Sequence, residues 1–92
     1  AQTSRRRTDE QWLSDLSAYG HRAADAQSDL LDALRHGLHR ALRPRGIDEA
    51  SIDDFAQEAA VRVLGALSTY QGQSRFTTWA IAIAVRVAFT HM

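Results

Sequence analysis

The 92-residue chain contains no cysteine, and this absence removes several classes of protein at once. Without thiols there is no disulfide framework, no thiolate metal site and no cysteine nucleophile. No apolar run is long enough to cross a membrane, since the most apolar stretch, residues 79–89, is interrupted by Arg86. The N-terminus also lacks the apolar segment of a signal peptide. We therefore expect a soluble, cytoplasmic protein that does not insert into a membrane.

An excess of either charge is also missing, because eleven basic and eleven acidic residues cancel. All eleven bases are arginine, which suits bidentate pairing with carboxylate or phosphate, although codon bias explains the same preference. A neutral domain has little sequence-independent hold on DNA, because that hold comes from replacing phosphate counterions with basic side chains. Any role with nucleic acid is therefore predicted to need a larger partner.

Residue constellations that support catalysis or metal binding are absent from the sequence. There is no glycine-rich phosphate loop and no serine elbow. His36 and His39 are three residues apart on one predicted helix, but no suitable third ligand adjoins them. Asp53 and Asp54 are adjacent and diverge around a helix, which disfavours a shared-proton pair. We predict that the chain is not an enzyme and binds no cofactor or metal.

Hydrophobic periodicity predicts helices throughout and no strands. Residues 1–8 carry no apolar periodicity and are predicted to form a flexible tail, followed by one domain over residues 9–92. The helices are predicted over about residues 9–19, 23–43, 51–68 and 76–91. The share of hydrophobic residues, 45%, is typical of a globular chain. The expected fold class is all-α, a compact bundle of about four helices.

The predicted first and fourth helices carry more specific expectations. In the first helix, Trp12, Leu13, Leu16 and Tyr19 recur at helical spacing and form its apolar side. The fourth helix is apolar nearly all round and is expected to be buried centrally or covered by a partner. One of its stripes contains Phe76, Trp79, Ala80, Ile83 and Val87, and a second contains Ile81, Val85 and Phe89. Ser74 or a neighbouring residue is expected to cap this helix.

Two sequence blocks lie in the second half of the chain. Residues 52–64 read IDDFAQEAAVRVL, and residues 70–86 read YQGQSRFTTWAIAIAVR. The first block follows the pattern of an acidic residue, Asp, two mostly apolar positions and Gln-Glu within a helix. The second block follows the pattern of a Gly-Xaa-Ser loop and then Phe-Xaa-Thr-Trp leading to Ile-Ala. The residues that match this pattern are Asp53, Asp54, Gln57, Glu58, Gly72, Ser74, Phe76, Thr78, Trp79, Ile83 and Ala84. This arrangement resembles region 2 of the extracytoplasmic-function (ECF) group of sigma-70 family factors, over a little under half of the chain.

The resemblance implies that the third helix docks on RNA polymerase core, at the clamp helices of the β′ subunit. Acidic and amide groups on an exposed helix face can receive arginine side chains from a partner helix, which favours orientation more than affinity. Periodicity alone favours a solvated face, and only the resemblance reverses that interpretation. The residues implied in polymerase binding are Asp53, Asp54, Gln57, Glu58, Val61 and Arg62.

The resemblance also implies that the domain opens the −10 promoter element and holds its non-template strand. Polar loop side chains can read the edge of an extruded base, Gly72 can let the strand approach closely, and Arg75 can meet a phosphate. Phe76 and Trp79 are expected in the core more than in base stacking. The residues implied in DNA binding are Gln71, Gly72, Gln73, Ser74, Arg75, Thr77, Thr78 and Arg86.

A second interpretation stays open, in which the chain is a sigma-like decoy that binds a regulator without recognising DNA. Ala82 occupies a position where factors of this group often carry arginine, and the neutral net charge points the same way. The loop around Gly72 favours DNA binding instead. The resemblance further implies an anti-sigma factor as a partner, and such a protein would explain the second apolar stripe of the fourth helix.

Overall fold

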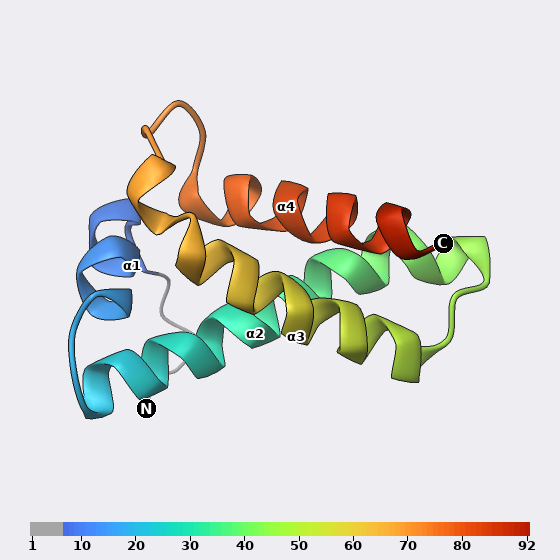
Figure 1. The fold of residues 1–92 in the computed structure, drawn as a ribbon, viewed down its shortest axis with the longest axis horizontal. Helices are drawn as coiled ribbons and strands as arrows, with labels where there is room; N and C mark the ends of the chain where they lie inside the picture. Colours follow the sequence, from blue (N-terminus) through green and yellow to red (C-terminus); the bar gives the residue numbers. More distant parts are fainter. Residues whose placement is uncertain (1–6) are drawn as a thin grey trace.

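The computed structural model describes residues 7–92, and within this range the chain folds as an all-α bundle. The helices are α1 (Asp9–Leu16), α2 (His21–Leu42), α3 (Glu49–Gly65) and α4 (Phe76–His91), with short 3-10 turns at η2 (Arg43–Arg45) and η3 (Leu67–Thr69). Figure 1 shows α2, α3 and α4 side by side, with α1 packed across one end. The predicted fold class is confirmed. No helix between residues 7 and 92 is both long and apolar enough to span a membrane.

The core is built on a leucine repeat in α2. Leucines at every fourth position share one face of a helix, and Leu30, Leu34, Leu38 and Leu42 are all fully buried. Burying each such side chain contributes roughly 1.5–3 kcal/mol. Smaller residues face this row from the neighbouring helices and allow close packing. They include Ala56, Ala59 and Val63 of α3 and Ala80, Ala84, Val87 and Ala88 of α4.

The ends of the helices differ from the predicted bounds by two to three residues at several places. Helix α1 ends at Leu16, so Tyr19, expected on its apolar side, lies in the connection and is 94% exposed. The reason is that residues 17–20 are needed to reverse the chain before α2 begins at His21. Helix α3 begins at Glu49 because Asp48 accepts a hydrogen bond from the Ser51 N–H at 3.2 Å, which caps the helix earlier than expected.

The N-terminal boundary of the fold also needs correction. Residues 1–6 of the predicted tail lie outside the described residues, but Arg7 and Thr8 belong to the fold. Thr8 Oγ1 accepts the Gln11 N–H at 3.0 Å, and Gln11 Oε1 accepts the Thr8 N–H at 2.9 Å, which forms a capping box. Arg7 Nε donates to Asp15 at 3.0 Å, and its guanidinium also pairs with Asp29.

Helices α2 and α4 cross most closely at Gly37. A Cβ atom at this position would lie 2.7–2.8 Å from three carbon atoms of Ile81. Glycine inside a helix costs about 1 kcal/mol relative to alanine, so its presence here needs a reason, and the close approach supplies one. Ile81 is therefore half-buried against α2, whereas Phe89 of the same predicted stripe is 46% exposed.

Candidate docking face and nucleic-acid interface

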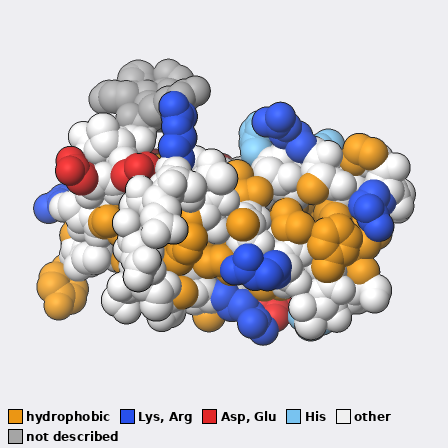
Figure 2. Space-filling model, turned by 90° about the horizontal axis from the view of Figure 1, so that it is seen from above, with side chains coloured by type: hydrophobic (Ala, Val, Ile, Leu, Met, Phe, Trp, Pro, Cys, Tyr) orange, Lys and Arg blue, Asp and Glu red, His pale blue; other side chains and the backbone are white. Residues whose placement is uncertain are grey.

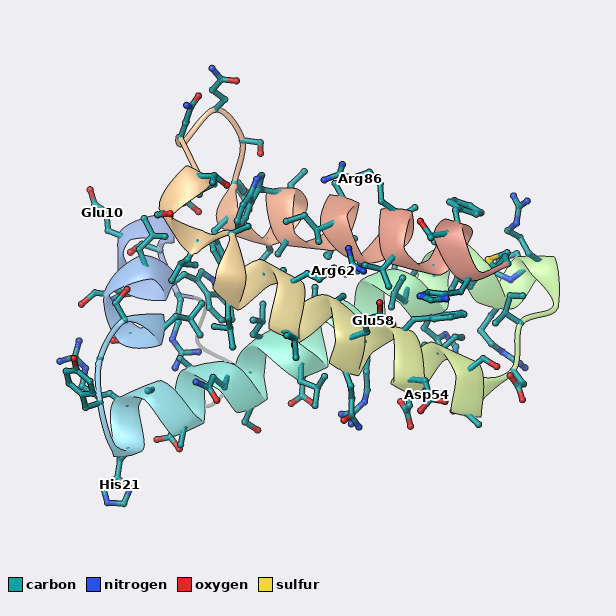
Figure 3. The ribbon with its side chains drawn as sticks, viewed as in Figure 1. Glu10, His21, Asp54, Glu58, Arg62 and Arg86 are labelled. Atoms are coloured by element: carbon teal, nitrogen blue, oxygen red, sulfur yellow. The ribbon has the colours of Figure 1, made fainter. Side chains whose placement is uncertain are left out.

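The outer face of α3 carries most of the residues predicted to bind polymerase. Asp54, Gln57, Val61 and Arg62 are exposed, and Glu58 is half-buried. Residues three and four apart share one side of a helix, so this set forms a continuous surface, and Figure 3 shows Asp54, Glu58 and Arg62 in succession along it. Val61, 70% exposed, places an apolar side chain among the polar ones. The surface therefore combines charge with a small apolar contact.

Glu58 is already engaged within the domain. Its carboxylate lies 3.2 Å from His91 Nε2 and 3.2 Å from Arg62 Nη2, and the His91 ring stacks on Phe55. The hydrogen bond from His91, with a further contribution from Arg62, lowers the pKa of Glu58. The stabilisation from this pairing is therefore present above the ordinary pKa of a glutamate and is lost as the pH falls through the lowered value. Glu58 connects α3 to the last turn of α4.

Asp53 and Asp54, adjacent in the sequence, have different surroundings. Arg35 Nε donates to Asp53 Oδ1 at 2.9 Å, so Asp53 lies at the junction between α3 and α2. Asp54 forms no ion pair with any residue in the range 7–92. The structure thus separates Asp53 from the other five predicted polymerase-binding residues, and it leaves the Asp54 carboxylate accessible.

The loop predicted to bind DNA stands above the start of α4 (Figure 1). Residues 71–75 are all exposed. Gly72 has a φ of 76°, a left-handed conformation that favours glycine over residues with a side chain. The Tyr70 hydroxyl donates to the Ser74 carbonyl and closes the loop. The loop is therefore a defined turn that presents its polar side chains to solvent.

The first turn of α4 is capped from another part of the chain. Ser74 or a neighbouring residue was predicted to supply the cap, but the Ser74 hydroxyl donates to the Arg75 carbonyl, and the N-cap residue Arg75 makes no side-chain cap bond. Instead the Phe76 N–H donates to Asp9 Oδ1 at 2.9 Å. A carboxylate at this position accepts a hydrogen bond from an amide that has no partner within the helix. Its negative charge also interacts favourably with the positive end of the helix dipole. Helix α1 thereby fixes the point at which α4 begins.

Removing this cap gives a testable result. Asp9→Ala is expected to lower the free energy of unfolding by about 1 kcal/mol, the usual cost of losing a capping side chain. Urea denaturation followed by circular dichroism measures the change. Glu10→Ala is the matched control, because Glu10 is also acidic and in the first turn of α1 but does not reach α4. Equal losses in both variants would show that only the dipole of α1 is involved.

An aromatic cluster supports the loop from below. Phe76 is fully buried and stacks on Trp12 with ring centroids 5.3 Å apart, and its ring meets Tyr70 edge-on at 5.5 Å. Trp79 is half-buried and lies 5.1 Å from Tyr70. Phe76 therefore belongs to the core, as the sequence indicated. The cluster joins α1, the loop and α4 into one packed unit.

The residues predicted to bind DNA are divided between two surfaces. Thr78 and Arg86 are exposed on the outer side of α4, with Ala82 between them at intervals of four residues. Thr77 is half-buried and lines a groove between α4 and α2 together with Arg75. The exposed loop lies at the end that these two surfaces share. The sequence did not indicate the groove, because its α2 wall carries no motif.

The family model for sigma-70 region 2 matches residues 30–92, from the middle of α2 to the end of α4. The chain therefore belongs to the sigma-70 family and represents its region 2. This region is the non-enzymatic domain that binds core RNA polymerase and recognises the −10 promoter element. No curated protein and no solved structure matched the chain.

Proposed function

We propose that this domain is region 2 of an ECF-group sigma factor. In this proposal the outer face of α3 docks on the clamp helices of the polymerase β′ subunit. The loop at residues 71–75 and the exposed side of α4 hold the non-template strand of the melted −10 element. The observation that carries the proposal is that two separate surfaces, both within the residues that the family model matches, are exposed on one bundle.

The mechanism requires no chemistry of the domain's own. Binding free energy released on contact with an unpaired strand shifts the promoter toward its open state, since a ligand favours the state it binds more tightly. The α3 face supplies orientation, because the accessible Asp54 carboxylate and the Gln57 amide can pair with arginine side chains of a partner helix. An anti-sigma partner remains a prediction from the sequence.

Docking is tested by calorimetric titration of the domain with an isolated β′ clamp-helix fragment. Asp54→Arg is expected to weaken binding by about tenfold, a loss of about 1.4 kcal/mol, because it reverses the charge at the contact. Asp54 is a cleaner probe than Glu58, whose replacement would also disrupt the pairs with His91 and Arg62. Asp25→Arg, the same change at an exposed position of α2, is expected to have no effect.

If the folded domain shows no saturable binding to the fragment, the docking assignment is wrong. The regulator-binding decoy then becomes the better interpretation of the same surface. Circular dichroism of each variant establishes that a loss of binding does not arise from a loss of helix.

The strand-binding half of the proposal is tested separately, in transcription from a −10-dependent promoter with reconstituted polymerase. Gln73→Ala is expected to reduce promoter opening severalfold, because an amide that reads a base edge is worth about 1–3 kcal/mol of discrimination. Binding to the β′ fragment is expected to stay unchanged, since the loop lies outside the α3 face. Gln27→Ala, at an exposed position of α2, is the matched control. Equal activity of both variants would remove Gln73 from the interface.

A further inference from the structure

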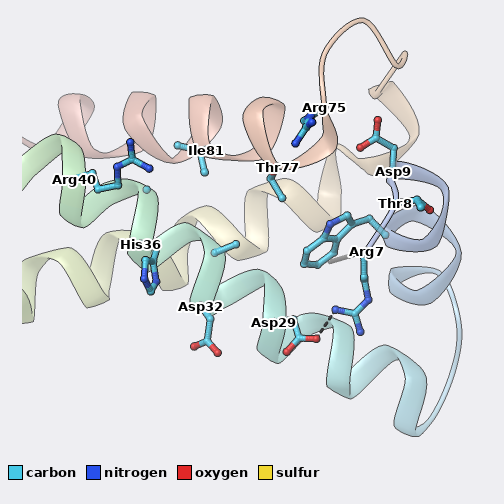
Figure 4. Close-up of a pocket in the computed structure, with 13 residues that line it drawn as sticks. Arg7, Thr8, Asp9, Asp29, Asp32, His36, Arg40, Arg75, Thr77 and Ile81 are labelled. Atoms are coloured by element: carbon cyan, nitrogen blue, oxygen red, sulfur yellow. Dashed lines mark hydrogen bonds and ion pairs between the residues drawn. The ribbon is translucent and has the colours of Figure 1, made fainter. Parts of the chain in front are cut away.

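A groove lies between α2 and α4, beside the start of α4 (Figure 4). The Gly37–Ile81 contact brings the two helices together and forms part of its lining. His36 and Arg40 reach it from α2, and Arg75 and Thr77 reach it from the start of α4. The groove therefore begins directly at the last residue of the exposed loop.

The acidic side chains that line the groove are all engaged by other groups. Asp29 pairs with Arg7, Asp32 Oδ1 lies 3.2 Å from Arg35 Nη1, and Asp9 accepts the Phe76 N–H. The basic side chains differ, because Arg40 and Arg75 form no ion pair within residues 7–92. Arg40 and Arg75 are therefore free to pair with an anion in this concave surface, while the lining as a whole, with three arginines and three aspartates, has no net charge.

The same asymmetry extends over the whole face around α4. Four arginines in the described range pair with carboxylates, namely Arg7, Arg22, Arg35 and Arg62. The five without such a pair are Arg40, Arg43, Arg45, Arg75 and Arg86, which lie on α4, beside its start, or at the end of α2 and in η2. Figure 2 shows arginine side chains distributed over this face. Zero net charge over the whole chain is therefore compatible with a local gathering of arginines on this face.

We propose that the groove binds the phosphodiester backbone of single-stranded DNA as the strand leaves the loop, with Arg75 and Arg40 each holding a phosphate. The proposal rests on the proposed function and adds Arg40 and the α2 wall, which lie outside the two motif blocks at residues 52–64 and 70–86. Residues 75 and 81 are separated by about 9 Å along the helix axis, and Figure 4 shows Arg40 beyond Ile81. The two guanidiniums therefore suit separate phosphates of one chain better than a single free ion.

Thr77 adds a neutral contact between the two arginines. Its hydroxyl can donate a hydrogen bond to a phosphate oxygen, a contact that positions a strand without reading its sequence. The expected binding is therefore independent of base sequence and dependent on salt, because each phosphate contact releases counterions.

The first measurement is a nuclear magnetic resonance titration of the whole chain with a single-stranded oligonucleotide at low salt. The Nε–Hε signals of Arg40 and Arg75 are expected to shift with a common saturation curve. The signal of Arg22, which is paired with Asp15 at the far end of α2, is expected to stay in place. The absence of any shift at Arg40 at millimolar oligonucleotide would overturn the proposal.

The second measurement is the salt dependence of oligonucleotide affinity. Arg40→Gln is expected to weaken binding severalfold and to reduce the log–log slope by about 0.7, the value for one phosphate contact on a single strand. The loss should be equal for a −10-like and a scrambled sequence, and Arg40→Lys should retain the slope. Arg22→Gln removes the same charge outside the groove and should leave both quantities unchanged.

Three results would contradict the proposal. The slope could be unchanged in Arg40→Gln, the loss could depend on sequence, or inorganic phosphate at matched ionic strength could displace the oligonucleotide, which would indicate a single-ion site. None of these readouts depends on the α3 face, so calorimetry with the β′ fragment remains an independent test of docking. Failure of one proposal is therefore distinguishable from failure of the other.

Discussion

Phe76→Ala is expected to reduce the free energy of unfolding by about 3–5 kcal/mol, the range for removing a buried aromatic side chain. Phe76 is fully buried and contacts Trp12, Tyr70 and Trp79 at centroid distances of 5.3–5.6 Å. Neighbours drawn from α1, the loop and α4 cannot all collapse into the space left behind. Such a loss is large for a small domain, whose total stability is about 5–15 kcal/mol.

Equilibrium urea denaturation, followed by tryptophan fluorescence and circular dichroism, measures this change. Phe89→Ala is the matched control on the same helix, because Phe89 is 46% exposed and contacts Arg45 at its surface. We expect the control to lose less than about 1.5 kcal/mol, since Phe89 keeps 46% of its surface exposed to water after folding. Similar losses in the two variants would contradict the central position of Phe76.

Gly37→Ala is expected to destabilise the domain by about 2 kcal/mol, although alanine is the better helix former by about 1 kcal/mol. The new methyl group would meet Cγ2, Cγ1 and Cδ1 of Ile81 at 2.7–2.8 Å. Because all three atoms belong to a β-branched side chain with few alternative rotamers, the two helices must separate. Overpacking of this kind costs about 1–3 kcal/mol, and we expect a cost at the upper end of this range. The better helix propensity of alanine offsets about 1 kcal/mol of that cost, which leaves a net loss of about 2 kcal/mol.

A double-mutant cycle isolates this contact. In an Ile81→Ala background the clash is absent, so adding Gly37→Ala is expected to be neutral or to stabilise by up to about 1 kcal/mol. The free energies of unfolding of the four proteins give the coupling between the two positions. If Gly37→Ala costs the same in both backgrounds, the helices do not meet as described.

The sequence was sufficient for the architecture because apolar residues recur at helical spacing along the predicted helices and the chain carries no competing strand pattern. The two motif blocks indicated the candidate site residues, and the structure places most of these residues on the outer face of α3 and around the loop. Both kinds of inference use residues that are close together in the sequence. Such local patterns can be recognised without knowing how the helices pack against one another.

The features that the sequence did not reveal all depend on contacts between distant residues. Asp9 caps α4 across 67 positions of the chain, and no local signal identifies such a partner. Gly37 resembles an ordinary helix-weakening residue until Ile81 is placed against it. The basic face around Arg40 and Arg75 is visible only once the other arginines have been assigned to their carboxylates.

The contact between Asp9 and Phe76 also has consequences for the order of folding. Helices α2, α3 and α4 follow one another and can pair through short loop closures, whereas the contact of Asp9 with Phe76 closes a loop of 67 residues. We expect the loop at residues 71–75 to acquire its final position late, when α1 docks. Opening of α1 alone would then release the loop while α3 keeps its shape, so amide exchange should be faster at Phe76 than at Ala59.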